Sequence, residues 1–236
     1  MPTAPRHSPS RRRLLLGAAA SMAVGTGAPA AAAAERHPAL RLIGESRLPQ
    51  AFRFRDTLVG GLSGLDYDPG RDQWLAISDR GEKALCYALR LDISADGLGA
   101  AEFLAVTPLD GPAHPNAESI RLRPDTDTLL WSTEGQVQIG APPALHESTR
   151  DGVLRRSFAL PLHFASAPGR GPRANLGFEG LALTPDGTQA WAAMENALLQ
   201  DGPEPAVGRP GGPCRFTLFD LASGQALAQR AYVPEP

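Results

Sequence analysis

Three stretches of the chain align without a gap and decide the fold: SGLDYDPGRDQWLAISD at 63–79, ESIRLRPDTDTLLWSTE at 118–134 and EGLALTPDGTQAWAAME at 179–195. Each begins with Ser or Glu, passes through a turn rich in Pro, Asp and Gly, and carries a tryptophan in its second half. Each ends on an acid sixteen residues after its first residue. A fixed internal pattern of this kind is typical of a repeat architecture.

The residues on either side of each turn alternate or run apolar, which predicts a β-hairpin in every copy. A second hairpin is expected after the first and third copies, over 84–107 and 215–233. After the second copy, we expect a loop at 142–151 and a strand over 153–160. Four strands per period, at spacings of 55 and 61 residues, predict an all-β fold, a β-propeller of four-stranded blades. A β-sandwich is the alternative, but it would not explain the spacing.

Three blades and a lead strand over 40–48 are fewer than the six or seven blades that usually close a propeller. We therefore expect an incomplete ring and a chain truncated at its C-terminal side. The domain organisation that follows is an export signal at 1–34 and the N-terminal blades of a propeller domain at 35–236.

The first 34 residues have the pattern of a twin-arginine signal, with Arg11, Arg12 and Arg13 before a weakly apolar run rich in Gly and Ala. A membrane anchor is the alternative, but Pro29 interrupts the run. Without this segment, 19 basic and 25 acidic residues give a net charge of −6, which favours binding of cations over binding of nucleic acid. The sequence leaves open whether Cys86 and Cys214 pair or stay free.

The first and last residues of a hairpin lie side by side at one end of it. If these hairpins are the inner strands of the blades, Ser63 and five carboxylates meet at one mouth of the central channel; the carboxylates are Asp79, Glu118, Glu134, Glu179 and Glu195. Carboxylates this close repel one another unless a cation or raised pKa values relieve the repulsion. Oxygen ligands alone suit Ca²⁺, and the amides of Asn116, Asn175 and Asn196 lie near them in sequence.

Three roles remain open for these acids: bracing of loops through backbone hydrogen bonds, a metal centre, or acid–base chemistry without metal. Arg80, Arg121 and Arg173 could neutralise them instead of a metal. The tryptophans are expected to pack between blades. Ser63 lacks the final glycine of a nucleophile elbow, because Leu65 stands there. His114, His146 and His163 lack a partner at helical spacing, so core or surface roles are expected.

The chain resembles the phytase-like family of exported bacterial propellers, known as "esterase-like activity of phytase". The resemblance rests on GGLSGLDYD with WLAISDRG, PNAESIRL with LLWSTEG, and NLGFEGLALTPDG with WAAMEN. It implies hydrolysis of phosphate or carboxylate esters and a relation to Ca²⁺-dependent phytases. A weaker similarity to gluconolactonase and paraoxonase propellers implies a divalent ion held by Glu, Asn and Asp at the channel mouth.

On the enzyme hypothesis, Asp79, Glu118, Glu134, Glu179 and Glu195 hold Ca²⁺, while Arg80 and Arg173 anchor a substrate phosphate or carboxylate. We then expect a periplasmic or secreted monomer, without a membrane anchor, that acts on a small-molecule ester or phosphate. The alternative is a non-catalytic periplasmic propeller that binds a small ligand or a protein partner.

Overall fold

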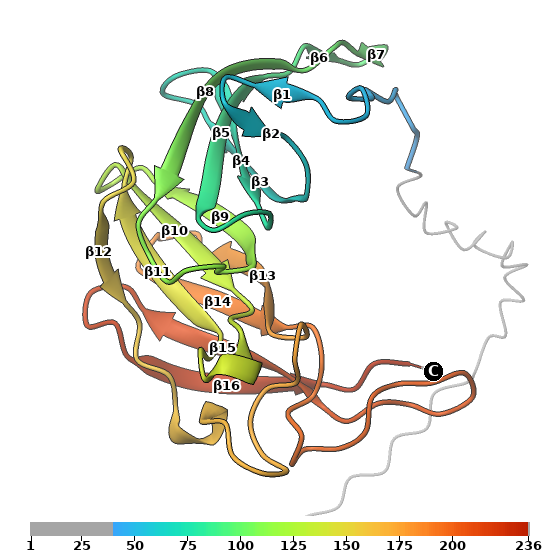
Figure 1. The fold of residues 1–236 in the computed structure, drawn as a ribbon, viewed down its shortest axis with the longest axis vertical. Helices are drawn as coiled ribbons and strands as arrows, with labels where there is room; N and C mark the ends of the chain where they lie inside the picture. The colour runs from blue at the N-terminus through green and yellow to red at the C-terminus, as the bar shows by residue number, and fades with distance from the viewer. Residues whose placement is uncertain (1–39, 236) are drawn as a thin grey trace, which may run out of the picture. The chain divides into compact units, whose positions relative to one another are not determined.

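The computed structural model describes residues 40–235, nearly all of them in the compact unit that begins at Leu42. The predicted export signal at 1–34 lies outside the described residues. Three four-stranded antiparallel sheets dominate this unit (Figure 1). Their strands are β3 (Leu62–Asp68), β4 (Gln73–Ser78), β5 (Ala84–Arg90) and β8 (Glu102–Leu109); β9 (Ala117–Arg123), β10 (Thr128–Thr133), β11 (Ala144–Thr149) and β12 (Leu154–Ser157); and β13 (Phe178–Leu183), β14 (Gln189–Met194), β15 (Cys214–Asp220) and β16 (Ala226–Tyr232).

Smaller elements lie between these strands. They are the ribbon of β1 (Arg53–Phe54) and β2 (Thr57–Leu58), the ribbon of β6 (Ile93–Ser94) and β7 (Gly97–Leu98), and the 3₁₀ helices η1 (Val137–Ile139) and η2 (Leu162–Phe164). No α-helix occurs within 40–235. None of the helices described there is long and apolar enough to cross a membrane.

Each large sheet is a meander of consecutive strands, and its first two strands are the hairpin of one repeat. The first strands of the three sheets lie next to one another, because β9 contacts both β3 and β13. Gly64 allows β3 to lie close to β9, since a Cβ there would lie 2.7 Å from the Cα of Ser119. The sheets are therefore blades of an all-β propeller, as predicted, and the repeats supply their inner strands.

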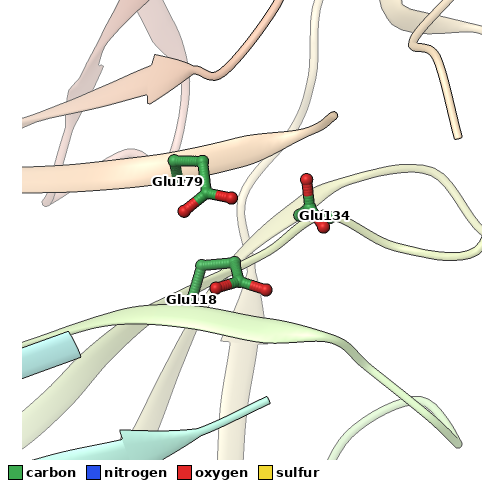
Figure 2. A group of neighbouring side chains, drawn as sticks. All are labelled: Glu118, Glu134 and Glu179. Atoms are coloured by element: carbon green, nitrogen blue, oxygen red, sulfur yellow. The ribbon is translucent and has the colours of Figure 1, made fainter. Parts of the chain in front are cut away.

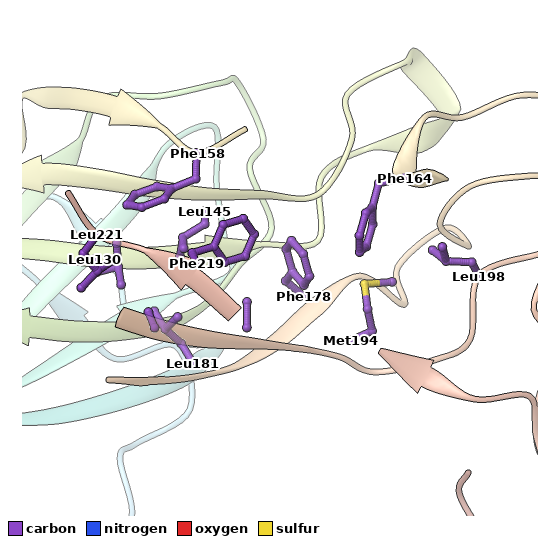
Figure 3. Packing of buried hydrophobic residues seen from close by; sticks show 12 residues of the cluster. Leu130, Leu145, Phe158, Phe164, Phe178, Leu181, Met194, Leu198, Phe219 and Leu221 are labelled. Atoms are coloured by element: carbon purple, nitrogen blue, oxygen red, sulfur yellow. The ribbon is translucent and has the colours of Figure 1, made fainter. Parts of the chain in front are cut away.

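The core lies between neighbouring blades rather than inside one sheet. Figure 3 shows the cluster that joins the second and third blades, in which Phe158, Phe178 and Phe219 pack edge to face. A second cluster joins the first two blades and includes the fully buried Trp131. The predicted interblade role is thus confirmed for this tryptophan. Cys86 and Cys214 are buried and free.

Two predictions about local structure were wrong. Residues 40–48 form no strand; Leu40 and Leu42 are exposed, and the first strands are instead β1 and β2. The predicted loop at 142–151 contains β11, which pairs with β10 on one side and β12 on the other. Pro142 and Pro143 directly precede this strand, and burial between two partner strands overrides the weak β-propensity of its Ala144 and Glu147.

Candidate metal centre

The first residue of every repeat lies at an irregularity of the inner strand. The pairing of β3 with β4 skips Ser63, the pairing of β9 with β10 skips Glu118, and the pairing of β13 with β14 skips Glu179. An unpaired residue at a β-bulge turns its side chain away from the regular alternation. The three bulges therefore set the direction of the opening side chains.

The last residue of every repeat is held by one backbone hydrogen bond in an equivalent place. The amide of Asp79 donates to the carbonyl of Gly61 at 2.8 Å, that of Glu134 to Asn116 at 3.0 Å, and that of Glu195 to Gly177 at 2.9 Å. Each acceptor precedes the opening residue of its repeat by two positions. The structural repeat thus begins two residues before the aligned sequence. The carbonyl of that earlier residue holds the backbone of the acid that ends the repeat.

Three glutamates from two blades converge (Figure 2). Glu118 lies on β9, Glu134 directly follows β10, and Glu179 lies on β13; one carboxylate oxygen from each lies within 4.8 Å of the others. Glu118 and Glu134 are buried, and Glu179 is half-buried. Such a group of hard oxygen donors has the composition of a calcium site.

Glu134 is the most firmly held of the three. Its Oε1 accepts a hydrogen bond from the amide of Gly177 at 2.7 Å, and its Oε2 accepts one from the side-chain amide of Asn116. The Asn116 amide also donates to Oδ1 of Asn175 at 3.0 Å. Gly177 approaches closely because it lacks a side chain: a Cβ there would lie 2.5 Å from the Cα of Glu134.

The site is electrostatically strained without a cation. Burial and the negative charges of neighbouring acids raise the pKa of Glu134 to about 7, although the hydrogen bond from Gly177 opposes this rise. The same causes, burial first and then the surrounding carboxylates, raise the pKa of Glu179 to about 7. Burial also raises the pKa of Glu118, against an opposing hydrogen bond from Ser63. A bound divalent ion would reverse these shifts.

Asp79 and Glu195 complete the acidic group, because both contribute repulsion to Glu118, Glu134 and Glu179. Oδ1 of Asp79 is buried and has no hydrogen-bond partner among the described residues. A buried carboxylate oxygen without a partner is costly, and a water molecule or an ion bound to it would lower that cost. Asp79 therefore fits a role as a metal ligand.

A polar cavity of about 330 Å³ opens beside the acids. Its walls carry oxygen and nitrogen donors and acceptors; they include Asp79, His114, Asn116, Gln136, Gln138 and Asn175. Asn116 and Asn175 have left-handed backbone conformations, with φ of 48° and 56°, a region that asparagine tolerates better than most residues. Asp79 is the one member of the acidic group in its walls, so the cavity gives a small polar group access to that carboxylate.

Comparison with known proteins decides the family. The model of the phytase-like family, described as "esterase-like activity of phytase", matches residues 57–236. The chain belongs to the phytase-like family. The resemblance drawn from the three repeats is thereby confirmed. No curated protein matches the chain.

Solved structures similar to this phytase-like chain are distant. They include the hydrazine synthase of Kuenenia stuttgartiensis (12% identity, TM-score 0.38, 77% of this chain and 53% of that one) and the periplasmic gluconolactonase of Pseudomonas aeruginosa (15%, 0.39, 76% and 60%). A putative 6-phosphogluconolactonase of Bacteroides fragilis is a third (12%, 0.37, 75% and 58%). The phytase-like chain thus spans less than two thirds of the length of each.

The two predicted anchoring arginines of this phytase-like chain lie in different settings. Arg80 is exposed next to Gly60, and its guanidinium has no hydrogen bond or ion pair among residues 40–235. Arg173 is largely buried and donates to the carbonyls of Ala197 at 3.2 Å and Gly202 at 2.5 Å, and to Glu204 at 3.4 Å. Arg80 is therefore available to a ligand, whereas Arg173 braces a loop.

Some features of the site were missed in the sequence. The three bulges cannot be read from a gapless repeat, and nothing in the pattern distinguished Gly177 from other glycines. Asn116 and Asn175 were expected beside the acids and lie there, but Asn196 instead accepts the amide of Ala197 at 2.8 Å.

His114, expected at the surface or in the core, lines the polar cavity. Its position four residues before the first residue of the second repeat was the available signal.

Proposed function

We propose that the chain is the propeller portion of an exported, Ca²⁺-dependent ester hydrolase whose ion is held by Asp79, Glu118, Glu134, Glu179 and Glu195. The observation that carries this proposal is the meeting of Glu118, Glu134 and Glu179 within 4.8 Å. The family's description, which combines phytase and esterase activity, supports hydrolysis of phosphate or carboxylate esters.

The residues present fit a calcium ion. All five side chains offer carboxylate oxygens, and burial together with the neighbouring carboxylates raises the pKa of both Glu134 and Glu179 to about 7. The unpartnered Oδ1 of Asp79 supplies a further oxygen without breaking any hydrogen bond. Calcium accepts six to eight oxygen ligands in flexible geometry, which suits a site built from separate blades.

When bound, the ion would act as a Lewis acid that polarises the scissile ester and acidifies water. Glu134 keeps its orientation because both of its oxygens accept hydrogen bonds. Half-buried Glu179 is better exposed than its two partners to exchange a proton with solvent. In the reaction, the oxygen of water bonds to the acyl carbon or phosphorus and the bond to the alcohol oxygen breaks. One proton goes to that oxygen and the other is released.

Arg80 is proposed to anchor a negatively charged group of the substrate, because its guanidinium is free among the described residues and it follows Asp79 directly. For Arg173, the same role would require it to give up its bonds to Ala197 and Gly202. We therefore assign substrate anchoring to Arg80 first.

The protein is further proposed to act in the periplasm or outside the cell as a monomer, on a small-molecule ester or phosphate. The twin-arginine pattern of residues 1–34 supports export, and the net charge of −6 over the rest of the chain disfavours nucleic acid.

The test is hydrolysis of an ethyl ester and of 4-nitrophenyl phosphate by the purified full-length protein, in calcium and in excess chelator. We expect activity with calcium, a loss of at least about 100-fold with chelator or in Glu118→Gln, and no loss in the control Glu102→Gln, which removes an exposed acid on β8. Undiminished hydrolysis in chelator would overturn the proposal. Calcium binding without hydrolysis of any ester would instead favour the non-catalytic propeller.

A further inference from the structure

A second cavity, of about 530 Å³, adjoins the polar one. The two share His114, Gly135 and Gln136 as walls. Its volume falls within the range of about 300–1,000 Å³ that is common for small-molecule sites. A ligand that reaches Asp79 through the polar cavity can therefore extend into this one.

The second cavity is apolar and preformed. Its walls include five prolines, which fix the local backbone, together with Phe158, Leu160, Leu162 and Phe164. Phe158 and Phe164 also belong to the core between the second and third blades, so this wall of the cavity is anchored. Little ordering is needed when a ligand binds such a pocket.

No charged residue lines this cavity. The polar side chains in its walls are His114, Gln136, His146 and Ser157. Burial lowers the pKa of His146 to about 4, so its ring is neutral at physiological pH, and its Nδ1 is paired with the Ser157 hydroxyl at 2.8 Å. A polyanion such as an inositol polyphosphate would find no cation here, whereas a hydrocarbon chain would lose nothing by leaving water.

We propose that the 530 Å³ cavity binds the apolar acyl chain of a carboxylate ester whose carbonyl lies at the acidic group. This inference rests on the proposed function and assigns its substrate class: esters of medium-chain acids rather than polyphosphorylated compounds. Hydrolysis then follows the bond changes given above, with the carboxylate, the released proton and the alcohol as products.

The first experiment compares kcat/KM for ethyl acetate and ethyl hexanoate in calcium. Each buried methylene is worth about fourfold, so we expect the hexanoate to be at least about tenfold better. Ala165→Phe, at an exposed wall position, should bring this ratio near one. The control Ala159→Phe changes an exposed alanine outside the walls and should preserve the ratio. A wild-type ratio near one, or a ratio unchanged in Ala165→Phe, would overturn the inference.

The second experiment does not depend on catalysis or calcium. Hexanamide, an uncharged analogue, should raise the melting temperature of the wild type more than acetamide does, and this difference should vanish in Ala165→Phe. Equal shifts with both amides refute the cavity's role. Calcium-dependent hydrolysis of inositol hexakisphosphate without hydrolysis of either ethyl ester would also refute the inference and leave the metal proposal standing. A protein that hydrolyses nothing but binds hexanamide would fail the proposed function alone.

Discussion

At the residue scale, the acidic group shows how burial and like charge combine. Glu118, Glu134 and Glu179 lie too close to be fully ionised together without a counterion, and Asp79 and Glu195 add to the repulsion. The two arginines predicted to anchor a substrate differ in their hydrogen bonding. Arg80 is free to meet a ligand, while Arg173 holds the carbonyls of a loop.

Substituting these arginines separates the two roles. Arg173→Ala leaves the Gly202 and Ala197 carbonyls without their donor, so we expect a loss of about 1–3 kcal/mol in the free energy of unfolding. Arg80→Ala should change that free energy by less than about 0.5 kcal/mol and raise KM for a negatively charged ester several-fold. Urea unfolding and steady-state kinetics measure both. Equal destabilisation by the two changes would contradict this assignment.

At the element scale, the sequence predicted the inner hairpins because a 17-residue repeat with central turn residues leaves little freedom of register. It predicted less well where pairing depends on distant strands. The pattern does not predict β11, because its pairing between β10 and β12 is a tertiary effect. The apolar residues within 40–48 predict a strand, but Leu40 and Leu42 are exposed and this segment pairs with no other strand within 40–235. The meeting of the acids followed from the repeat; the bulges and the support from Gly177 did not.

Gly177 tests this support directly. In Gly177→Ala the new Cβ would lie 2.5 Å from the Cα of Glu134, so the strand end must shift. We expect destabilisation by about 1–3 kcal/mol and a weakened response to calcium. Gly97→Ala is the matched control, because its Cβ would meet nothing within 4 Å. Thermal melts with and without calcium give the comparison, and a calcium response in Gly177→Ala equal to that of Gly97→Ala would show that Glu134 needs no such contact.

At the scale of the whole molecule, the acidic group links three blades and couples their packing to pH. Burial and neighbouring charge raise the folded-state pKa of Glu134 and Glu179 from the ordinary value of 4.5 to about 7. Between these two values the folded chain binds more protons than the unfolded chain. The stability contributed by their protonation is therefore complete below about pH 4.5 and is lost as the pH rises through about 7.

In chelator, we accordingly expect the melting temperature to fall by several degrees between pH 5 and pH 8, beyond the change in a Glu134→Gln, Glu179→Gln double variant. Calcium should remove most of this fall, because it binds the ionised carboxylates and displaces their protons. Differential scanning calorimetry across that range provides the measurement. A wild-type profile that matches the double variant would show that these two groups do not titrate in this window.

Calcium binding by the wild type and by Glu118→Gln and Glu179→Gln tests the central claim most directly. An affinity typical of extracellular calcium modules predicts that 10 mM Ca²⁺ raises the wild-type melting temperature by about 3 to 10 °C at pH 7.5. In chelator, each variant should melt at or above the wild type, because it has lost a repelling charge, and each should lose most of the calcium response. Glu102→Gln should behave as the wild type. An equal calcium response in all four proteins, or none in the wild type, would contradict a metal centre at this group.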